Sequence, residues 1–502
     1  MAFLPIGCWG QDTLFTADLQ LLSRGEIRNG GMNRNTDEPT VENKSAFILD
    51  RERITLNYQR AWLEAKVAVQ HTGTWGHEGA SNTSIYEAWG KLTTRNGFFA
   101  QIGRMGLRYD DERIIGVNDW TMTARSHDAL RVGFESPVGR KYGRHQVHAI
   151  LAYNQNMRAV TSPGSYYTNG SCPYKTMQTV WYHYDLPRVP LGISVLLMNI
   201  GMQSGYPEGT DGNAPHTEWQ RVYGGYVKYT PKNFSFEGTY YRQTGHDEFM
   251  SKLDAWMAAF KAEWMPDNRW AVRAGYDFLS GDDYVILVEK GAIGMTFHEV
   301  NKGFNPIYGS HHKFYGAMDF FYLSTFINGF TPGLQNAYIG GTYRPLKNLS
   351  LNASYHYFAT GIKLEDLNRT LGHEIDLEAS YRLFKDVQVA AGFSYMTGTE
   401  TMRRLKQDNG DGSLRWAWLS VNIAPRLFSA KWQIINYSLS EPQGRLPVPR
   451  PAKQQNNLSA SLPWNGRWGF FLCLTLKKKQ TTMKREKYES QLQLLKVMRE
   501  TT

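Results

Sequence analysis

Hydrophobic and polar positions alternate with a period of two along most of this chain. The clearest example is residues 252–281, where KLDAWMAAFKAEW is followed by a turn at 266–268 and by WAVRAGYDFLSG. In each half, an apolar face carries aromatic residues near both ends, and Lys261 and Arg273 belong to the opposite faces. Successive side chains of a strand point to opposite sides. The pattern predicts a β-hairpin with one face toward lipid and one toward water, although a hairpin of a soluble sandwich alternates in the same way.

The same unit repeats from residue 14 to residue 424, which gives about 18 candidate strands. Short turns, such as 231–233 and 266–268, alternate with long polar loops, such as 110–127 and 281–334. Outer-membrane barrels have short periplasmic turns and long extracellular loops. We therefore predict an all-β fold, a transmembrane antiparallel β-barrel of about 18 strands with that loop asymmetry.

Two of the candidate strands fit the alternation poorly. In residues 98–108, Gln101 shares a face with Phe99 and Met105, and residues 192–203 are apolar on both faces. Each of these strands either contains a bulge or packs against a loop that enters the barrel.

Composition agrees with a barrel and narrows the function. Aromatic residues make up 14% of the 502 residues while mean hydropathy is only −0.48, and no run of 18 apolar residues is present. Of the net charge of +10, residues 433–502 contribute an excess of eight, so the basicity belongs to the tail and does not indicate a nucleic-acid partner. The three cysteines have no metal-binding spacing. We predict no metal, no cofactor and no enzymatic activity, because no GxSxG motif or nucleophile–base pair is present.

The chain divides into three parts. Residues 1–10 are interpreted as the remnant of a signal peptide, because an apolar stretch leads to small residues, although the basic n-region is absent and a short disordered N-terminus is the alternative. Residues 11–432 are predicted to form the barrel, which would end on Trp432, an aromatic residue of the kind that the barrel-assembly machinery reads. Residues 433–502, with four prolines in 442–451, are expected to be a basic tail outside the barrel or a periplasmic extension that binds a partner.

Three segments resemble the alginate-export-type family of outer-membrane barrels, especially its Bacteroidetes-like members. They are GRMGLRYDDERIIGVNDWTMTARSHDALRVGF at 103–134, FNPIYGSHHKFYGAMDFF at 304–321 and, more weakly, DRERITLNY at 50–58. The resemblance implies an 18-stranded monomeric pore in the outer membrane of a Gram-negative bacterium. In the protein that names the family, basic residues line a constriction that passes an anionic uronate polymer.

The faces assigned to the lumen, together with the resembling segments, give a set of predicted pore-lining residues. Basic residues prevail in the early strands and acidic residues in the later ones, and Arg113 and Arg125 can line a constriction only if their loop folds inward. The set is Arg51, Arg53, Lys66, Lys91, Arg104, Arg108, Arg113, Arg125, Asp128, Arg131, Lys261, Arg273 and Asp277.

The leading hypothesis is a porin-like channel for hydrophilic solutes, including anionic or oligosaccharide substrates. Its expected partners are outer-membrane lipid, small hydrophilic or polyanionic solutes and the assembly machinery. The alternative is a structural or surface ligand-binding barrel whose lumen is plugged by a loop, for which 281–334 is the best candidate.

Overall fold

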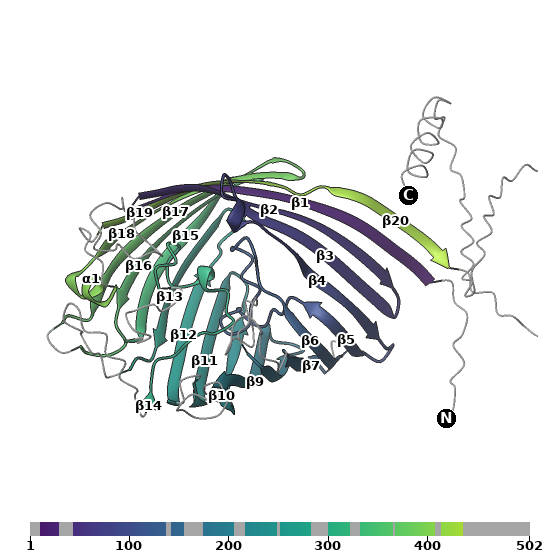
Figure 1. Ribbon diagram of the computed structural model, residues 1–502, viewed down its shortest axis with the longest axis horizontal. Helices are drawn as coiled ribbons and strands as arrows, with labels where there is room; N and C mark the ends of the chain where they lie inside the picture. The colour runs from purple at the N-terminus through teal and green to yellow at the C-terminus, as the bar shows by residue number, and fades with distance from the viewer. Residues whose placement is uncertain are drawn as a thin grey trace, which may run out of the picture. The chain divides into compact units, whose positions relative to one another are not determined.

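The computed structural model describes residues 11–29, 44–136, 142–154, 174–204, 216–247, 251–282, 300–321, 332–364, 367–406 and 413–434. They form one sheet that closes into a barrel (Figure 1). The strands are β1 (Gln11–Asn29), β2 (Lys44–Arg60), β3 (Leu63–Thr74), β4 (Asn82–Thr93), β5 (Phe98–Met105), β6 (His127–Glu135), β7 (Arg144–Tyr153), β8 (Thr176–Asp185), β9 (Leu191–Ser204), β10 (His216–Tyr229), β11 (Phe234–His246), β12 (Lys252–Trp264), β13 (Trp270–Leu279), β14 (Val300–Asn301), β15 (Leu334–Leu346), β16 (Leu349–Ala359), β17 (Thr370–Phe384), β18 (Val387–Gly398), β19 (Ser413–Ile423) and β20 (Arg426–Ile434).

The barrel closes where β1 meets the last strands of the series. β1 pairs on one side with β2 and on the other with β19 and β20, all antiparallel. β19 and β20 act as one strand interrupted at Pro425, whose ring removes a backbone N–H from the ladder. Of the 20 strands, β14 is a two-residue addition parallel to β12, and β19 and β20 count as one strand. The described barrel wall therefore has 18 antiparallel strands, as predicted.

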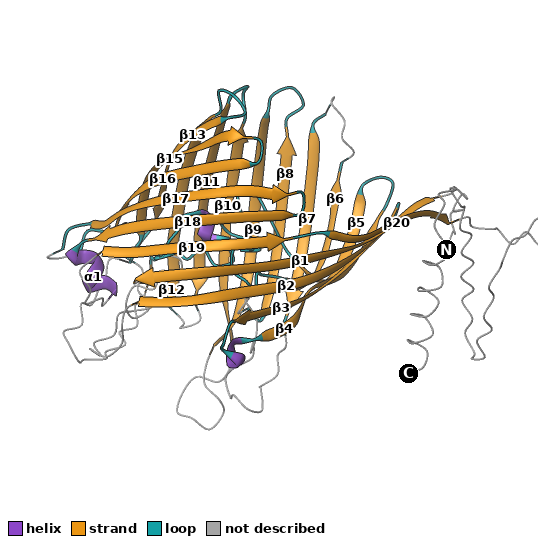
Figure 2. Cartoon of the chain, turned by 90° about the horizontal axis from the view of Figure 1, so that it is seen from above, coloured by secondary structure: helices purple, strands orange, loops and turns teal. Residues whose placement is uncertain are grey.

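The connections alternate in length, which confirms the predicted asymmetry. β2 and β3 are joined by two residues and β17 and β18 by another two, whereas 21 residues separate β5 from β6. The helix α1 (Glu400–Lys406) lies in the long connection between β18 and β19, at one end of the strands (Figure 2). Among the described residues, no helix is long and apolar enough to cross a membrane.

The outer face of the barrel is apolar and carries aromatic residues near both ends of the strands. Trp256, Phe260 and Trp264 of β12 are 39%, 53% and 47% exposed on this face. Trp270 of β13 stacks on Tyr343 with ring centroids 4.1 Å apart. Lys261, Arg273 and Asp277 point the other way and line an internal cavity, as the hairpin pattern predicted. An apolar band between two aromatic girdles is the surface that a barrel presents to lipid.

The inner face encloses a hydrophobic core rather than open water. Wall residues such as Ile150, Met198 and Trp416 are buried against loop residues such as Ile115 and Tyr308. This explains β9, which is apolar on both faces: its inward residues pack against the loops. The core therefore fills part of the lumen.

Two regions of the predicted organisation lie outside the described residues. They are the signal-peptide remnant at 1–10 and nearly all of the tail at 433–502, of which only the last two residues of β20 are described.

Candidate functional site

Two long loops fold into the barrel and meet there. They are residues 106–126, between β5 and β6, and residues 300–321, from the connection between β13 and β15. Ile115 and Tyr308 form a parallel bridge, in which the Gly116 N–H donates to the Tyr308 carbonyl at 2.8 Å. The described part of the 281–334 connection therefore enters the lumen, as the plug hypothesis expected.

The backbone of both loops is strained. Apart from Lys232, every described non-glycine residue with positive φ lies in them, including Glu112 (φ 68), Tyr315 (φ 60) and the β-branched Ile307 (φ 24). A Cβ added at Gly116 would lie 2.3 Å from the Ser310 hydroxyl, so the close approach of the loops requires glycine. Strain of this kind persists only where the surroundings hold it, and it gathers at functional sites.

Arg113 is the main anchor of the first loop. Its side chain is 4% exposed, and it donates to Asp111 Oδ2 at 2.9 Å and to Asp277 Oδ1 at 2.8 Å. Its guanidinium carbon lies 3.9 Å from the centroid of Phe314 in the second loop. The buried Asp277 of β13 also accepts a hydrogen bond from Asn336 at 2.8 Å. Arg113 thus joins both loops to the wall.

Glu112 links the two loops through a second set of contacts. Its carboxylate accepts hydrogen bonds from the Ser310 hydroxyl at 2.7 Å and from Lys313 at 2.6 Å. Burial alone raises the pKa of this carboxyl, but the hydrogen bonds from Lys313 and Ser310 outweigh burial and leave the pKa below its usual value. Arg125 adds a hydrogen bond of 3.0 Å to the Gly309 carbonyl.

An aromatic cluster fastens the loops to the region where the barrel closes. Trp120 of the first loop stacks on His312 of the second, with ring centroids 3.8 Å apart and planes 3° apart. The guanidinium of Arg24 on β1 lies 4.0 Å from the Trp120 ring. Glu26 accepts hydrogen bonds from Arg24 at 2.8 Å and from Trp416 at 3.0 Å, so the cluster is continuous with the wall.

Most of the predicted pore-lining cations are engaged by protein groups. Their partners come from the loops or from neighbouring strands: Arg51 with Asp119 (3.2 Å), Arg53 with Gln70 (2.7 Å), Lys66 with Glu87, Lys91 with Glu64 (3.7 Å), Arg108 with Glu112 (3.2 Å), Arg131 with Gln101 and Lys261 with Glu237 (2.9 Å). The lumen charge that a solute meets is therefore much smaller than a count of basic residues implies.

Two of the predicted pore residues are not in the lumen. Arg104 and Asp128 form an ion pair of 2.7 Å on the outer face, with side chains 41% and 50% exposed. The inward positions of β5 are instead Phe99, Gln101 and Met105, all buried. The prediction that Arg104 and Asp128 line the pore is wrong, because the inner face of β5 meets loop side chains and is therefore largely apolar.

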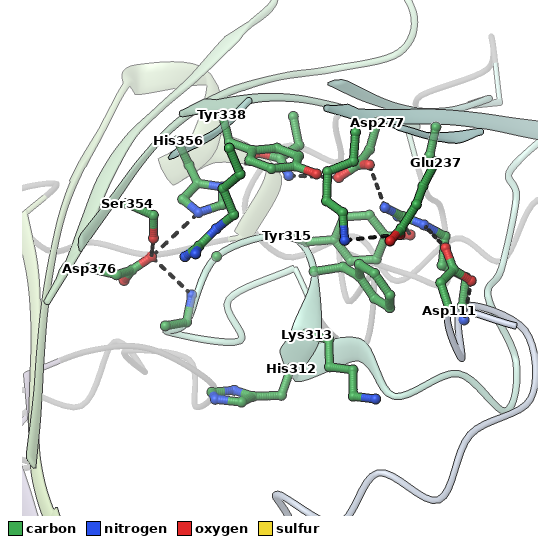
Figure 3. A pocket seen from close by; sticks show the side chains of 18 of the residues that line it. Asp111, Glu237, Asp277, His312, Lys313, Tyr315, Tyr338, Ser354, His356 and Asp376 are labelled. Atoms are coloured by element: carbon green, nitrogen blue, oxygen red, sulfur yellow. Dashed lines mark hydrogen bonds and ion pairs between the residues drawn. The ribbon is translucent and has the colours of Figure 1, made fainter. Parts of the chain in front are cut away.

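A cavity of about 560 Å³ lies between the loops and the wall strands from β10 to β19 (Figure 3). Tyr315 and Lys313 of the second loop extend into it, with Glu237 on one side and Asp376 on the other. The lining carries both signs of charge together with hydroxyl and amide groups. It can hold a small polar solute.

Several residues of this site were not among those predicted from the sequence. Trp120, His312, Lys313 and Phe314 lie in loops, where no period exists to show which side chains face inward. Arg24, Glu26 and Arg28 did carry a signal, because they are charged residues at three alternate positions near the end of β1.

Comparison with known proteins gives a likeness in structure only. No protein-family model and no curated protein matches the chain. OccK9 (OpdG) of Pseudomonas aeruginosa matches with a TM-score of 0.54 and 11% identity over 82% of this chain and 98% of that one. OccK5 (OpdH) of the same organism matches with a TM-score of 0.51, 11% identity and 82% and 99% coverage. OccK2 (OpdF) of the same organism, solved in complex with glucuronate, matches with a TM-score of 0.50 and 12% identity over 82% of this chain and 98% of that one.

These neighbours are outer-membrane porins. At such low identity the likeness establishes the fold, which is that of an 18-stranded porin barrel. Together with the apolar outer band, the fold defines an integral outer-membrane β-barrel.

Proposed function

We propose that this protein is an outer-membrane channel that passes small hydrophilic solutes one at a time. The observation that carries the proposal is the meeting of loops 106–126 and 300–321 inside a closed barrel, with a polar cavity of about 560 Å³ beside them. Pockets of a few hundred cubic ångströms hold small ligands. A polymer of the size that the alginate-export-type resemblance suggests would require both loops to move.

Small carboxylates are the anionic solutes that we propose for this channel. Lys261, Arg273 and Lys313 line the cavity, and Arg273, which forms no ion pair among the described residues, gives it a positive group that a carboxylate can approach. The OccK2 complex with glucuronate supplies a precedent in a protein of the same fold. Sugars are proposed as neutral solutes on the strength of the hydroxyl and amide groups in the lining.

We also propose that the chain is related to the alginate-export-type barrels. The two segments that carry most of the resemblance, 103–134 and 304–321, contain the loops that meet in the lumen. The resemblance thus falls on the part of the barrel that controls passage.

The channel is tested by conductance and reversal potential in planar bilayers. We expect discrete conductance steps, and Arg273→Ala should shift the reversal potential in a salt gradient toward cation preference, because it removes a positive charge from the passage. Arg104→Ala is the matched control, since Arg104 lies on the outer face, and it should leave the reversal potential unchanged. A folded barrel that never conducts would exclude the channel.

A plugged, surface-binding barrel is the second proposal. It is favoured by the tight burial of Phe304, Tyr308 and Ile115 where the loops meet. Under this proposal arabinose would not enter proteoliposomes containing the intact protein, and entry would begin only after residues 300–321 are deleted. Entry at the same rate before and after deletion would contradict it.

A further inference from the structure

Arg273 and Glu378 line the cavity but take no part in its network of ion pairs, and Asp110, which also takes no part, accepts hydrogen bonds from Trp181 and Tyr241 instead. Arg113 is matched by Asp111 and Asp277, and Glu237 is matched by Lys228 and Lys261. Within the described part of the chain, no carboxylate lies within 4.0 Å of the Arg273 guanidinium, and no cation lies within 4.0 Å of the Glu378 carboxylate.

Arg273 is held along the wall with its charge facing the cavity. Its Nη1 donates to the Thr342 hydroxyl at 3.3 Å. A Cβ added at Gly340 would lie 3.2 Å from Arg273 Nε and 3.1 Å from Ser354 Cβ, so the arginine lies across the glycine toward β16. Glu263 stands opposite Arg273 in the β12–β13 register, yet the two form no ion pair among the described residues. The guanidinium therefore borders the cavity without a carboxylate in ion-pair contact among the described residues.

The cavity wall across from Arg273, on strand β17, is acidic. In the register of the sheet, Arg273 of β13 is paired with Gly340 of β15, Gly340 with Ser354 of β16, and Ser354 with Asp376 of β17. Arg273 and Asp376 therefore lie at the two ends of a row of four residues whose middle two are small. Asp376 accepts a hydrogen bond from Ser354 at 3.4 Å. Glu378, two residues further along β17, borders the cavity and is exposed to it. Arg273, Asp376 and Glu378 all line the same cavity of about 560 Å³, and this gap can hold a small solute beside the guanidinium and the carboxylates.

We propose that this gap is a binding site for a small zwitterion, a solute of the amino-acid type with one carboxylate and one ammonium group. This proposal rests on the channel function proposed above. The solute carboxylate pairs with Arg273, and the ammonium group pairs with Glu378, with Asp376 beside it. A simple carboxylate gains only the first contact and meets the repulsion of two carboxylates, whereas a zwitterion gains both contacts.

The test compares alanine with lactate, which have nearly the same size but carry an ammonium and a hydroxyl group respectively. Uptake of each labelled solute into proteoliposomes containing the full-length protein is measured at pH 7 and divided by the arabinose uptake of the same preparation. We expect alanine to exceed lactate. Glu378→Gln should lower the alanine-to-lactate ratio by about threefold, as for the loss of one partly exposed charge pair. Arg273→Gln should lower the uptake of both solutes.

Two controls separate the site from general effects. Glu64→Gln removes a lumen carboxylate that pairs with Lys91 and does not line the cavity, and it should leave the alanine-to-lactate ratio unchanged. The charge-swapped variant Arg273→Glu/Glu378→Arg should regain preference for alanine, because a zwitterion can bind in reverse. Heat-dependent mobility in gels verifies that each barrel is folded.

The outcomes distinguish the two proposals. Equal relative uptake of alanine and lactate by the intact protein, or a ratio unaffected by Glu378→Gln, would overturn the zwitterion site while arabinose still enters. Failure of arabinose to enter would overturn the channel itself.

Discussion

Replacement of Arg113 by methionine should release the inward loops while the barrel stays folded. Methionine keeps much of the apolar volume but leaves Asp277, whose side chain is 1% exposed, without its cation. Removal of one partner of a buried pair costs about 3–5 kcal/mol, and the lower end applies here because the adjoining cavity can supply water to the carboxylate. A cost of about 3 kcal/mol shifts the balance between held and released loops by roughly a hundredfold.

Single-channel recording and thiol labelling measure this release. We expect Arg113→Met to give larger and noisier conductance steps. A cysteine introduced at Ile115, which is 1% exposed, should react faster with a membrane-impermeant maleimide in that background. Arg108→Met is the matched control, because Arg108 lies in the same loop but its side chain is 53% exposed, and Glu112, with which it pairs, keeps its contacts with Ser310 and Lys313. Wild-type conductance and labelling in Arg113→Met would refute the assignment of Arg113 as the anchor.

Three further predictions follow from the wall, the loops and the tail. Phe260→Arg, on the lipid face, should destabilise the barrel by about 2–4 kcal/mol in urea unfolding from lipid vesicles, whereas Phe260→Leu should cost far less. Hydrogen bonds hold the pKa of the Glu112 carboxyl below its usual 4.5. The stabilisation that Glu112 gives to the contact between the loops is therefore complete above pH 4.5 and is lost as the pH falls through the lowered pKa. Conductance should therefore rise only below about pH 4.5, and Glu112→Gln should remove that rise. Deletion of residues 433–502 should leave membrane insertion intact, and loss of insertion would assign the tail a role in assembly.

The barrel could be predicted from the sequence because the face toward lipid follows a simple rule: alternate residues are apolar, with aromatic residues near the strand ends. Trp256, Phe260 and Trp264 recur on one face of β12, and the loops alternate in length, so strand number and orientation followed. The rule for the inner face was incomplete. It assumed water throughout the lumen, whereas Met105 of β5 meets a loop core, and this inverted the assignment of Arg104.

The candidate site was predictable only in part. The alternation correctly directed Lys261, Arg273 and Asp277 inward. It could not indicate that Asp277 would be neutralised by Arg113, 164 positions away, because that contact depends on how a loop folds inside the closed barrel. Which charges remain available to a solute is therefore a property of tertiary structure.

The central claim, that this barrel is a channel narrowed by two internal loops, is tested most directly by arabinose entry into proteoliposomes. The full-length protein and a variant lacking residues 300–321 are compared at equal amounts of folded barrel. The account predicts measurable entry through the intact protein and faster entry after deletion. No entry through the intact protein would contradict it.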